Sequence, residues 1–186
     1  MLGFASIETD TLPGREMTIL VRAMTVEESG LVIDYFYSST PEYLEMLGVD
    51  PTRFPPRQIW AERFADQFRL PVHERQAFFL IWLADSETVG FSSCDKILFG
   101  DQANMHLHVT TPERRRSGIG TECVCQSVEL YFTALELKRL YCEPNAFNIG
   151  PNRTLQKAGF KYLKTHYTVP GPRNFHQAVT RWVIER

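Results

Sequence analysis

The spacing of apolar and polar positions divides the first part of the chain into strand and helix segments. Alternating apolar positions in residues 17–24 predict a strand, and residues 25–39 predict a helix with Thr25 as its cap and acidic residues in its first turn. Between residues 41 and 71, proline and glycine punctuate two short helical segments, the second over residues 57–69. A strand followed by three helices therefore opens the chain.

The later pattern continues as strands and helices in turn. Residues 76–85, 87–97 and 103–111 predict three strands of an antiparallel meander, and "DSET" is the tight turn between the first two. Apolar residues at helical spacing predict a long helix from Gly118. The strand "RLYCEP", a short helix after Pro151 that ends at Gly159, and a strand over residues 160–169 follow. The order predicts one α/β (α+β) domain over residues 17–186, preceded by an arm over residues 1–16.

Composition narrows the class of protein. The chain is 44% hydrophobic and 23% charged with a formal net charge of -2, which favours a folded core and excludes a general polyanion-binding surface. No apolar run has the length that a bilayer requires, and the four cysteines form no C-x-x-C pair. We expect a cytoplasmic protein with buried free thiols, no membrane partner and no nucleic-acid partner.

A candidate anion site lies in "RRRSGIGTE", between a strand and a helix. The N-terminus of a helix favours an anion, and glycine lets a phosphate approach the backbone, so a diphosphate is one interpretation. A solvated turn is the other. A P-loop would need Lys followed by Ser or Thr, and a dinucleotide fingerprint would need glycine where Cys123 stands. Both nucleotide motifs are therefore disfavoured.

Two motifs resemble the GNAT superfamily of N-acetyltransferases. Arg115-x-x-Gly118-x-Gly120 is similar to the R/Q-x-x-G-x-G/A loop that holds the acetyl-CoA pyrophosphate, and "NIGPNRTLQKAGF" is similar to a second motif of bacterial members, matching at Asn148, Gly159 and Phe160. The resemblance implies a mixed, mostly antiparallel sheet of about seven strands flanked by four helices. It also implies that the sheet splays between strands four and five, where acetyl-CoA enters as co-substrate.

The same resemblance implies which residues contact the cofactor. The backbone of residues 109–111 would face the thioester carbonyl, and the glycine loop and second motif would hold the rest of acetyl-CoA. The implied residues are Val109, Thr110, Thr111, Arg115, Arg116, Ser117, Gly118, Ile119, Gly120, Thr121, Asn148 and Asn152.

Acetyl transfer to an amine requires a base, because an aliphatic ammonium has a pKa of about 10.4. A strand's period of two places His106 and His108 on one face with Asn104, where imidazole suits proton abstraction. The pair resembles the histidines of arylalkylamine N-acetyltransferases, with His106 matching directly and His108 displaced by two residues. Glu143 is the competing base, and a structural hydrogen-bonding role is its alternative. For the two histidines the alternatives are satisfied polar residues on a half-wet face or a metal site that lacks further ligands here. We expect no metal ligands.

The proton donor for the leaving thiolate is harder to assign. Many members of the family carry Tyr four residues before the glycine of the second motif, and this chain has Leu155 there. Tyr162 and Tyr167 lie on the next strand, and Tyr167 is the candidate, although an aromatic residue in a strand is more often simply packed. We expect no covalent acyl-cysteine.

The acceptor pocket is expected between the segment after the first helix and the loop over residues 170–177. Aromatic and apolar walls with nearby carboxylates would suit an amine. These residues are Tyr35, Tyr37, Tyr43, Met46, Phe54, Trp60, Glu42, Glu45 and Asp50, and several of the aromatics could equally be core.

Three functions follow from these observations. The first is an acetyl-CoA-dependent N-acetyltransferase that moves the acetyl group directly to a primary amine of a small molecule or peptide. The second is a non-catalytic acyl-CoA-binding sensor of the same fold, which the absence of the usual tyrosine favours. The third is a nucleic-acid module, which would need a wider basic face than three arginines. The sequence leaves a homodimer open.

Overall fold

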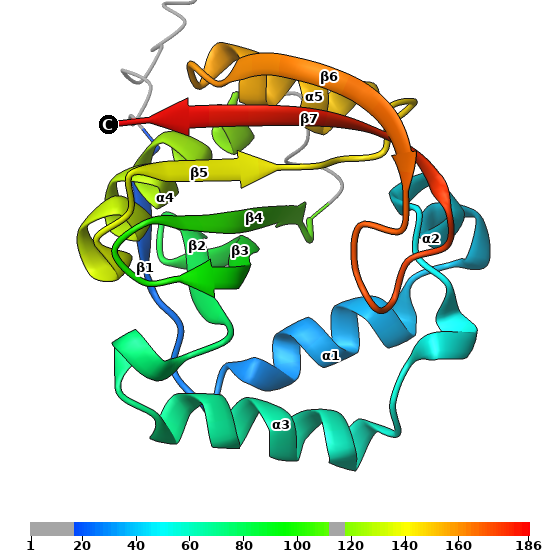
Figure 1. Ribbon diagram of the computed structural model, residues 1–186. Coiled ribbons are helices and arrows are strands. Elements are labelled where there is room, and N and C mark those ends of the chain that lie inside the picture. Colours follow the sequence, from blue (N-terminus) through cyan, green and yellow to red (C-terminus); the bar gives the residue numbers. More distant parts are fainter. Residues whose placement is uncertain (1–16, 112–117) are drawn as a thin grey trace, which may run out of the picture.

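The computed structural model describes residues 17–111 and 118–186, and these form a seven-stranded sheet in the order β1-β2-β3-β4-β5-β7-β6 (Figure 1). All neighbouring strands are antiparallel except β4 and β5, which are parallel. The strands are β1 Ile19–Ala23, β2 Phe78–Ala84, β3 Glu87–Leu98, β4 Gln102–Val109, β5 Arg139–Cys142, β6 Lys161–Thr168 and β7 Gln177–Glu185. The arm expected over residues 1–16 lies outside the described residues.

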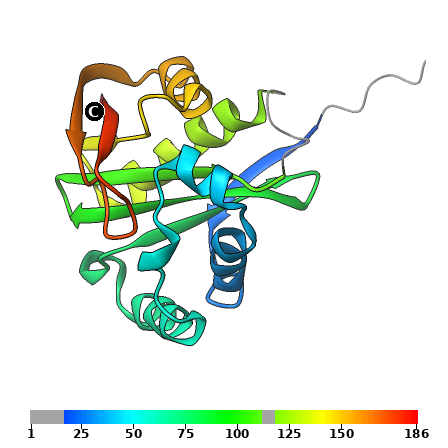
Figure 2. The ribbon, with the colours of Figure 1, turned by 90° about the vertical axis from the view of Figure 1, so that its right-hand side faces the viewer.

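Helices cover both faces of the sheet (Figure 2). α4 and α5 pack on one face, and α1 and α3 pack on the other. The α-helices are α1 Ser29–Ser38, α2 Pro41–Leu47, α3 Arg57–Arg69, α4 Ile119–Leu135 and α5 Ile149–Lys157, and the 3-10 helices are η1 Pro51–Arg53 and η2 Val72–Glu74. No helix in the described part of the chain is long and apolar enough to cross a membrane.

The described residues contain five α-helices, one more than the four that the family resemblance implied. The additional helix is α2, which is bounded by Pro41 in its first turn and by Gly48 at φ +75° behind it. Proline starts a helix without losing a hydrogen bond, and a left-handed glycine ends one. These two residues separate α2 from the helices on either side.

The first helix begins later than the sequence predicted. α1 starts at Ser29, and Thr25 is not its cap, because residues 25–28 form a turn. The Glu28 carboxylate accepts a hydrogen bond from the Thr25 backbone N–H at 2.9 Å and pairs with Arg22 of β1 at 2.6 Å. The acidic residue thus ties the turn to the strand instead of serving the first helical turn.

The predicted turn at "DSET" is confirmed. β2 and β3 pair up to Ala84 and Glu87, and Asp85 and Ser86 connect them at φ 50° and 71°. Two successive residues with positive φ are typical of a type I′ turn, whose twist matches that of the flanking strands.

The sheet splays open between β4 and β5, as the family resemblance implied. The parallel ladder joins only Gln102–Met105 to Arg139–Cys142, while β4 continues to Val109. The first turn of α4 lies beside this opening, since a Cβ on Gly120 would sit 3.9 Å from both Val109 Cγ2 and Thr154 Oγ1 of α5.

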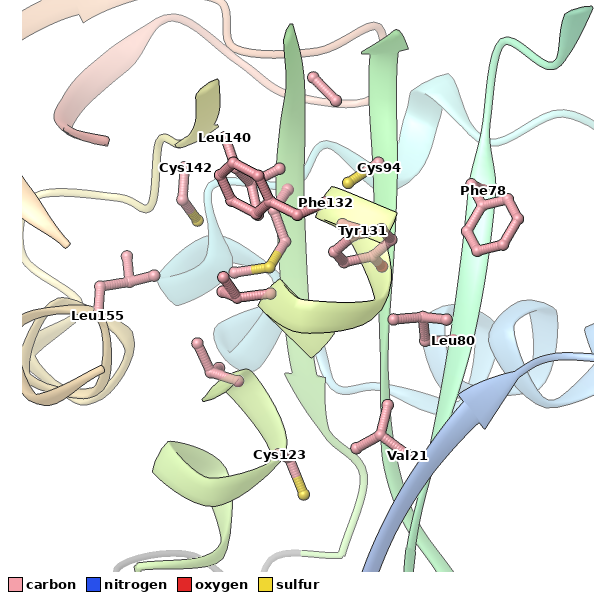
Figure 3. Packing of buried hydrophobic residues seen from close by; sticks show 14 of the residues in the cluster. Val21, Phe78, Leu80, Cys94, Cys123, Tyr131, Phe132, Leu140, Cys142 and Leu155 are labelled. Carbon is pink, nitrogen blue, oxygen red and sulfur yellow. The ribbon is translucent and has the colours of Figure 1, made fainter. Parts of the chain in front are cut away.

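The core between the sheet and α4 keeps this opening in shape. Leu155 of α5 and Leu140 of β5 are fully buried and point toward the α4 residues Tyr131 and Phe132 (Figure 3). Leu155 stands where many family members have the tyrosine proton donor, and here it is part of the core.

Candidate active site

The predicted diphosphate loop ends at the start of α4. Gly118 precedes the helix at φ +89°, a left-handed conformation that favours glycine, and its carbonyl accepts hydrogen bonds from Thr121 N at 3.0 Å and Glu122 N at 3.4 Å. The N–H groups of Ile119 and Gly120 precede the first intrahelical bonds and remain available for an anion. Arg115, Arg116 and Ser117, which were predicted to complete the loop, lie outside the described residues.

The end of β4 turns part of its backbone toward the opening. The Thr110 N–H donates to Val89 O of β3 at 3.0 Å. Because peptide groups alternate along a strand, those of Leu107 and Val109 point to the side from which β5 has diverged. The β3–β4 register is regular from His106 to Val109, so splaying rather than a strand bulge orients these amides.

The second motif builds the start of α5. The Asn152 side-chain amide donates to Asn145 O at 3.0 Å and Asn148 O at 2.8 Å, and its Oδ1 accepts from Trp182 Nε1 at 2.9 Å. Asn148 lies at the cap position and makes no side-chain cap hydrogen bond. Asn152 therefore holds the helix start in place, and cofactor contacts by Asn148, Asn152 and Thr111 remain predictions.

β4 presents its histidines on the face opposite α4. Met105, Leu107 and Val109 pack with the α4 core, so His106 and His108 point toward the face that α1 and α3 cover. The alternation that the sequence predicted is thus present in the strand.

His108 is enclosed by aromatic rings. Its imidazole stacks on Phe91 at a centroid distance of 4.8 Å and meets Tyr35 and Phe36 edge-on. Its Nδ1 lies 3.2 Å from the Tyr35 hydroxyl, which in turn lies 2.9 Å from the Tyr43 hydroxyl. Burial, with the charges of His106 and Arg173, lowers the pKa of His108 to about 3. His108 is therefore neutral near pH 7 and is a poor proton acceptor.

The lowered pKa makes His108 a source of acid instability. The unfolded chain takes up a proton on this histidine near pH 6.5, whereas the folded chain resists protonation down to about pH 3. Stability should fall as pH is lowered through this window, by at most about 1.4 kcal/mol per pH unit from this group. Urea unfolding at pH 7 and pH 5 should show a smaller loss for His108→Leu than for the wild type. His73→Leu, at an exposed histidine, should keep the wild-type loss.

His106 has an acidic partner that the sequence did not reveal. Its Nε2 lies 3.1 Å from Asp95 Oδ1 of β3, and both side chains are about one-third exposed, at 32% and 31%. Burial acts to raise the pKa of Asp95, but the charges of His106 and Lys96 and the neighbouring polar groups of His106 and Asn104 outweigh it, so the net pKa is lowered. Asp95 thus stays ionised beside the imidazole of His106.

Glu143, the competing base, is part of an ion pair. Its side chain is only 6% exposed, and Arg181 of β7 lies 3.0 Å from Oε1, with His166 at 3.7 Å. The carboxylate is thus engaged by a guanidinium of the neighbouring strand. This arrangement matches the structural alternative better than the role of base.

Tyr167 lies on the edge strand β6, which β5 and β7 separate from β4. Its side chain is 71% exposed and stacks on His176. The structure does not place Tyr167 beside His106 or His108, and its role as acid remains a prediction.

The buried cysteines are poor nucleophiles. Burial raises the pKa of Cys123 to about 12 and raises those of Cys94 and Cys142 as well. Protonated thiols are consistent with direct transfer of the acetyl group rather than with an acyl-cysteine intermediate.

The two segments expected to form the acceptor pocket do meet. Asp50 N donates to Arg173 O at 2.8 Å, and Gln177 Nε2 donates to Gly48 O at 2.8 Å. A hollow of about 500 Å³ beside α1 is lined by Leu31, Asp34, Tyr35, Ser38 and Thr110. Its lining includes Thr110, which follows the end of β4, and Tyr35, the partner of His108.

Several of the residues that were expected to line the acceptor pocket lie in the core, on the surface or in other contacts. Trp60 is 5% exposed and belongs to the core under α3, whereas Tyr37 and Met46 are 37% and 45% exposed. Asp50 accepts hydrogen bonds from Thr52 and pairs with Arg53, so it is used within its own turn. Glu42 and Glu45 are exposed on α2.

A sheet that splays beside a glycine-led helix, with a histidine of the splayed strand paired to a carboxylate of the neighbouring strand, is the arrangement expected of an acyl-transferring α/β domain. The sequence matches the family model of the acetyltransferase (GNAT) domain over residues 19–161. The chain belongs to this family, which confirms the resemblance found in the two motifs.

Known structures share the fold at low sequence identity. An aminoglycoside acetyltransferase AAC(6')-Ib in complex with coenzyme A is 18% identical with a TM-score of 0.66, covering 91% of this chain and 95% of that one. A ribosomal-protein-S5-alanine acetyltransferase from Vibrio fischeri is 16% identical with a TM-score of 0.69, covering 90% and 92%. A spermidine N-acetyltransferase from Vibrio cholerae in complex with CoA and spermine is 14% identical with a TM-score of 0.70, covering 90% and 95%. No curated protein matches the sequence.

Proposed function

We propose that this chain transfers an acetyl group from acetyl-CoA directly to a primary amine of a small molecule or peptide. The observation that carries the proposal is the pair of His106 on β4 and Asp95 on β3, 3.1 Å apart, because the far end of β4 opens beside the first turn of α4. One strand thus links a proton acceptor to an anion-binding helix start. The free thiols and the need for acetyl-CoA suit the cytoplasm.

In the proposed reaction His106 removes a proton from the acceptor ammonium, and Asp95 stabilises the resulting imidazolium. The free amine then attacks the carbonyl carbon of the thioester, and its electrons form the C–N bond. Negative charge develops on the carbonyl oxygen, where the amide of Leu107 at the β4 opening would stabilise it. The C–S bond breaks, the attacking nitrogen loses its second proton to give the amide, and the departing CoA thiolate takes up a proton from water, so that the protons balance. The neutral His108 and the hydroxyl of Tyr35 form one wall of this site.

The second candidate is an acyl-CoA-binding sensor, which Leu155 in place of the usual tyrosine favours. The solvent-accessible opening between β4 and β5 weakens that argument, because water can protonate a thiolate as it leaves. A sensor would also have no use for the His106–Asp95 pair.

The proposal is tested by following release of the CoA thiol from acetyl-CoA with a panel of acceptors, alongside calorimetric binding of CoA. The structural neighbours suggest aminoglycosides, polyamines and peptide N-termini, and amino acids complete the panel. Thiol release that requires an acceptor, with mass-spectrometric detection of the acetylated amine, is the expected result. CoA binding without turnover on any acceptor would favour the sensor, and absence of CoA binding would overturn both functions.

A further inference from the structure

The loop between β6 and β7 is fixed over the histidine face of the sheet. Lys96 Nζ of β3 donates to Pro170 O at 2.8 Å, and Asn174 Nδ2 donates to Gly48 O at 2.9 Å. Figure 1 shows the loop reaching from the end of β6 down to α2. Because both sides of the loop are tied down, the residue between them, Arg173, has a defined position.

The side chain of Arg173 points inward rather than to solvent. Its guanidinium carbon lies 5.0 Å above the ring of Trp60, and its backbone carbonyl is held by Asp50 N. Its charge lowers the pKa of His108, after burial and His106. It also interacts with Asp95, the partner of His106. The guanidinium therefore lies within the acceptor side of the site, between α3 and β3.

No carboxylate within the described residues forms an ion pair or hydrogen bond with the Arg173 side chain. Burial lowers the pKa of Arg173, Asp95 opposes this, and the nearby Arg63 of α3 adds to it. Arg63 is exposed and likewise forms no ion pair with another described residue. Two neighbouring cations, one of them largely buried, thus have no carboxylate in direct contact among the described residues, and Asp95 acts on Arg173 only through its charge.

Such an arrangement is costly unless something else supplies the negative charge. Burying a guanidinium without hydrogen-bond acceptors removes its hydration without replacing the lost hydrogen bonds, and a second cation nearby adds electrostatic repulsion. A stacking contact with Trp60 recovers only about 0.5–2 kcal/mol of this cost. A planar fork of donors matches a carboxylate or a phosphate, which can accept two parallel hydrogen bonds.

We propose that Arg173, assisted by Arg63, binds an anionic group of the acceptor, so that the acceptor carries a carboxylate or phosphate as well as its reacting amine. This proposal rests on the proposed function. His106, with Asp95 behind it, receives the ammonium end, and Arg173 receives the anionic end of the same molecule. The two arginines also repel polycations, so this specificity differs from that suggested by the spermine-bound and aminoglycoside-related neighbours.

The experiment compares acceptors that differ only in the anionic group. The pairs are amino acids with their carboxamides, for the carboxylate, and phosphoethanolamine with ethanolamine, for the phosphate. For the wild type we expect kcat/KM at least about tenfold higher for the anionic member of one pair, and the pair that responds identifies the anion. Arg173→Gln should remove this preference by raising KM much more for the anionic member than for the neutral member, because it removes binding common to ground and transition states. Arg173→Lys should retain part of it.

Two further measurements separate specificity from folding and from the proposed function. Thermal unfolding identifies any variant that misfolds, and Arg69→Gln, at an exposed arginine paired with Asp66, is the matched control. Calorimetric binding of the same acceptors in the presence of CoA reports on Arg173 without turnover. Equal affinity and kcat/KM for both members of every pair in the wild type would overturn the proposal, as would equal losses for both members in Arg173→Gln. If amines bind with the anionic preference but no acetyl group is transferred, the proposed function fails and this proposal stands.

Discussion

Replacing Gly118 with Asp is expected to abolish CoA binding. Gly118 adopts φ +89° immediately before α4, and no atom of the described residues lies within 4 Å of an added Cβ. The new carboxylate would occupy the position in which the helix start is proposed to hold the CoA diphosphate. Like charges placed together cost several kcal/mol, so calorimetry with CoA should show affinity weakened by at least about 100-fold.

Two controls separate charge from backbone strain. Gly118→Asn has nearly the same shape and tolerates the left-handed conformation, and it should bind CoA far better than Gly118→Asp. Gly100→Asp is the matched control, because Gly100 has φ +77° with nothing within 4 Å and lies in the turn between β3 and β4. Its CoA affinity should equal that of the wild type. Wild-type affinity in Gly118→Asp would place the cofactor elsewhere.

The elements of the fold could be predicted where local chemistry determines them. α3 spans Arg57–Arg69 as predicted, because prolines bound its apolar repeat, and the "DSET" turn follows from residues that accept positive φ. The predicted start of α1 was wrong because Glu28 pairs with Arg22. This contact joins two elements, and no local sequence pattern contains it. Local signals therefore gave the elements, and tertiary contacts adjusted their ends.

The site could be predicted only in part, for the same reason. The period of two correctly placed His106 and His108 on one face of β4. It could not show that Asp95 meets His106, because the β3–β4 register contains a shift between Asp95 and Leu98. Nor could it place Arg173, whose loop docks on a segment more than 100 residues earlier, through the 126-residue separation of Asn174 and Gly48. The roles of His106 and His108 also differ, and only the aromatic enclosure of His108 reveals this.

Removing the proposed base should slow turnover without weakening cofactor binding. His106→Ala leaves the acceptor ammonium without its proton acceptor, and general-base catalysis typically contributes about 10²–10⁴-fold. We expect kcat to fall within that range at saturating acceptor, with CoA affinity unchanged, and added imidazole to restore part of the rate. His73→Ala is the matched control, since His73 also lies beside a carboxylate, Glu74 at 3.5 Å, but on the exposed helix η2. A wild-type rate for His106→Ala would assign the base to another residue.

Asp95→Asn tests whether the carboxylate acts through His106. The amide has nearly the same shape but cannot stabilise an imidazolium, so kcat should fall by about tenfold or more while KM for the acceptor changes little. Residues that act as a unit are not additive, and the double variant His106→Ala/Asp95→Asn should therefore be no slower than His106→Ala alone. Additive losses would instead mean that the charge of Asp95 acts directly on the acceptor ammonium. In that case Asp95→Asn would raise KM for the acceptor. A fall in kcat therefore indicates that Asp95 acts through His106, and a rise in KM indicates that it acts on the acceptor.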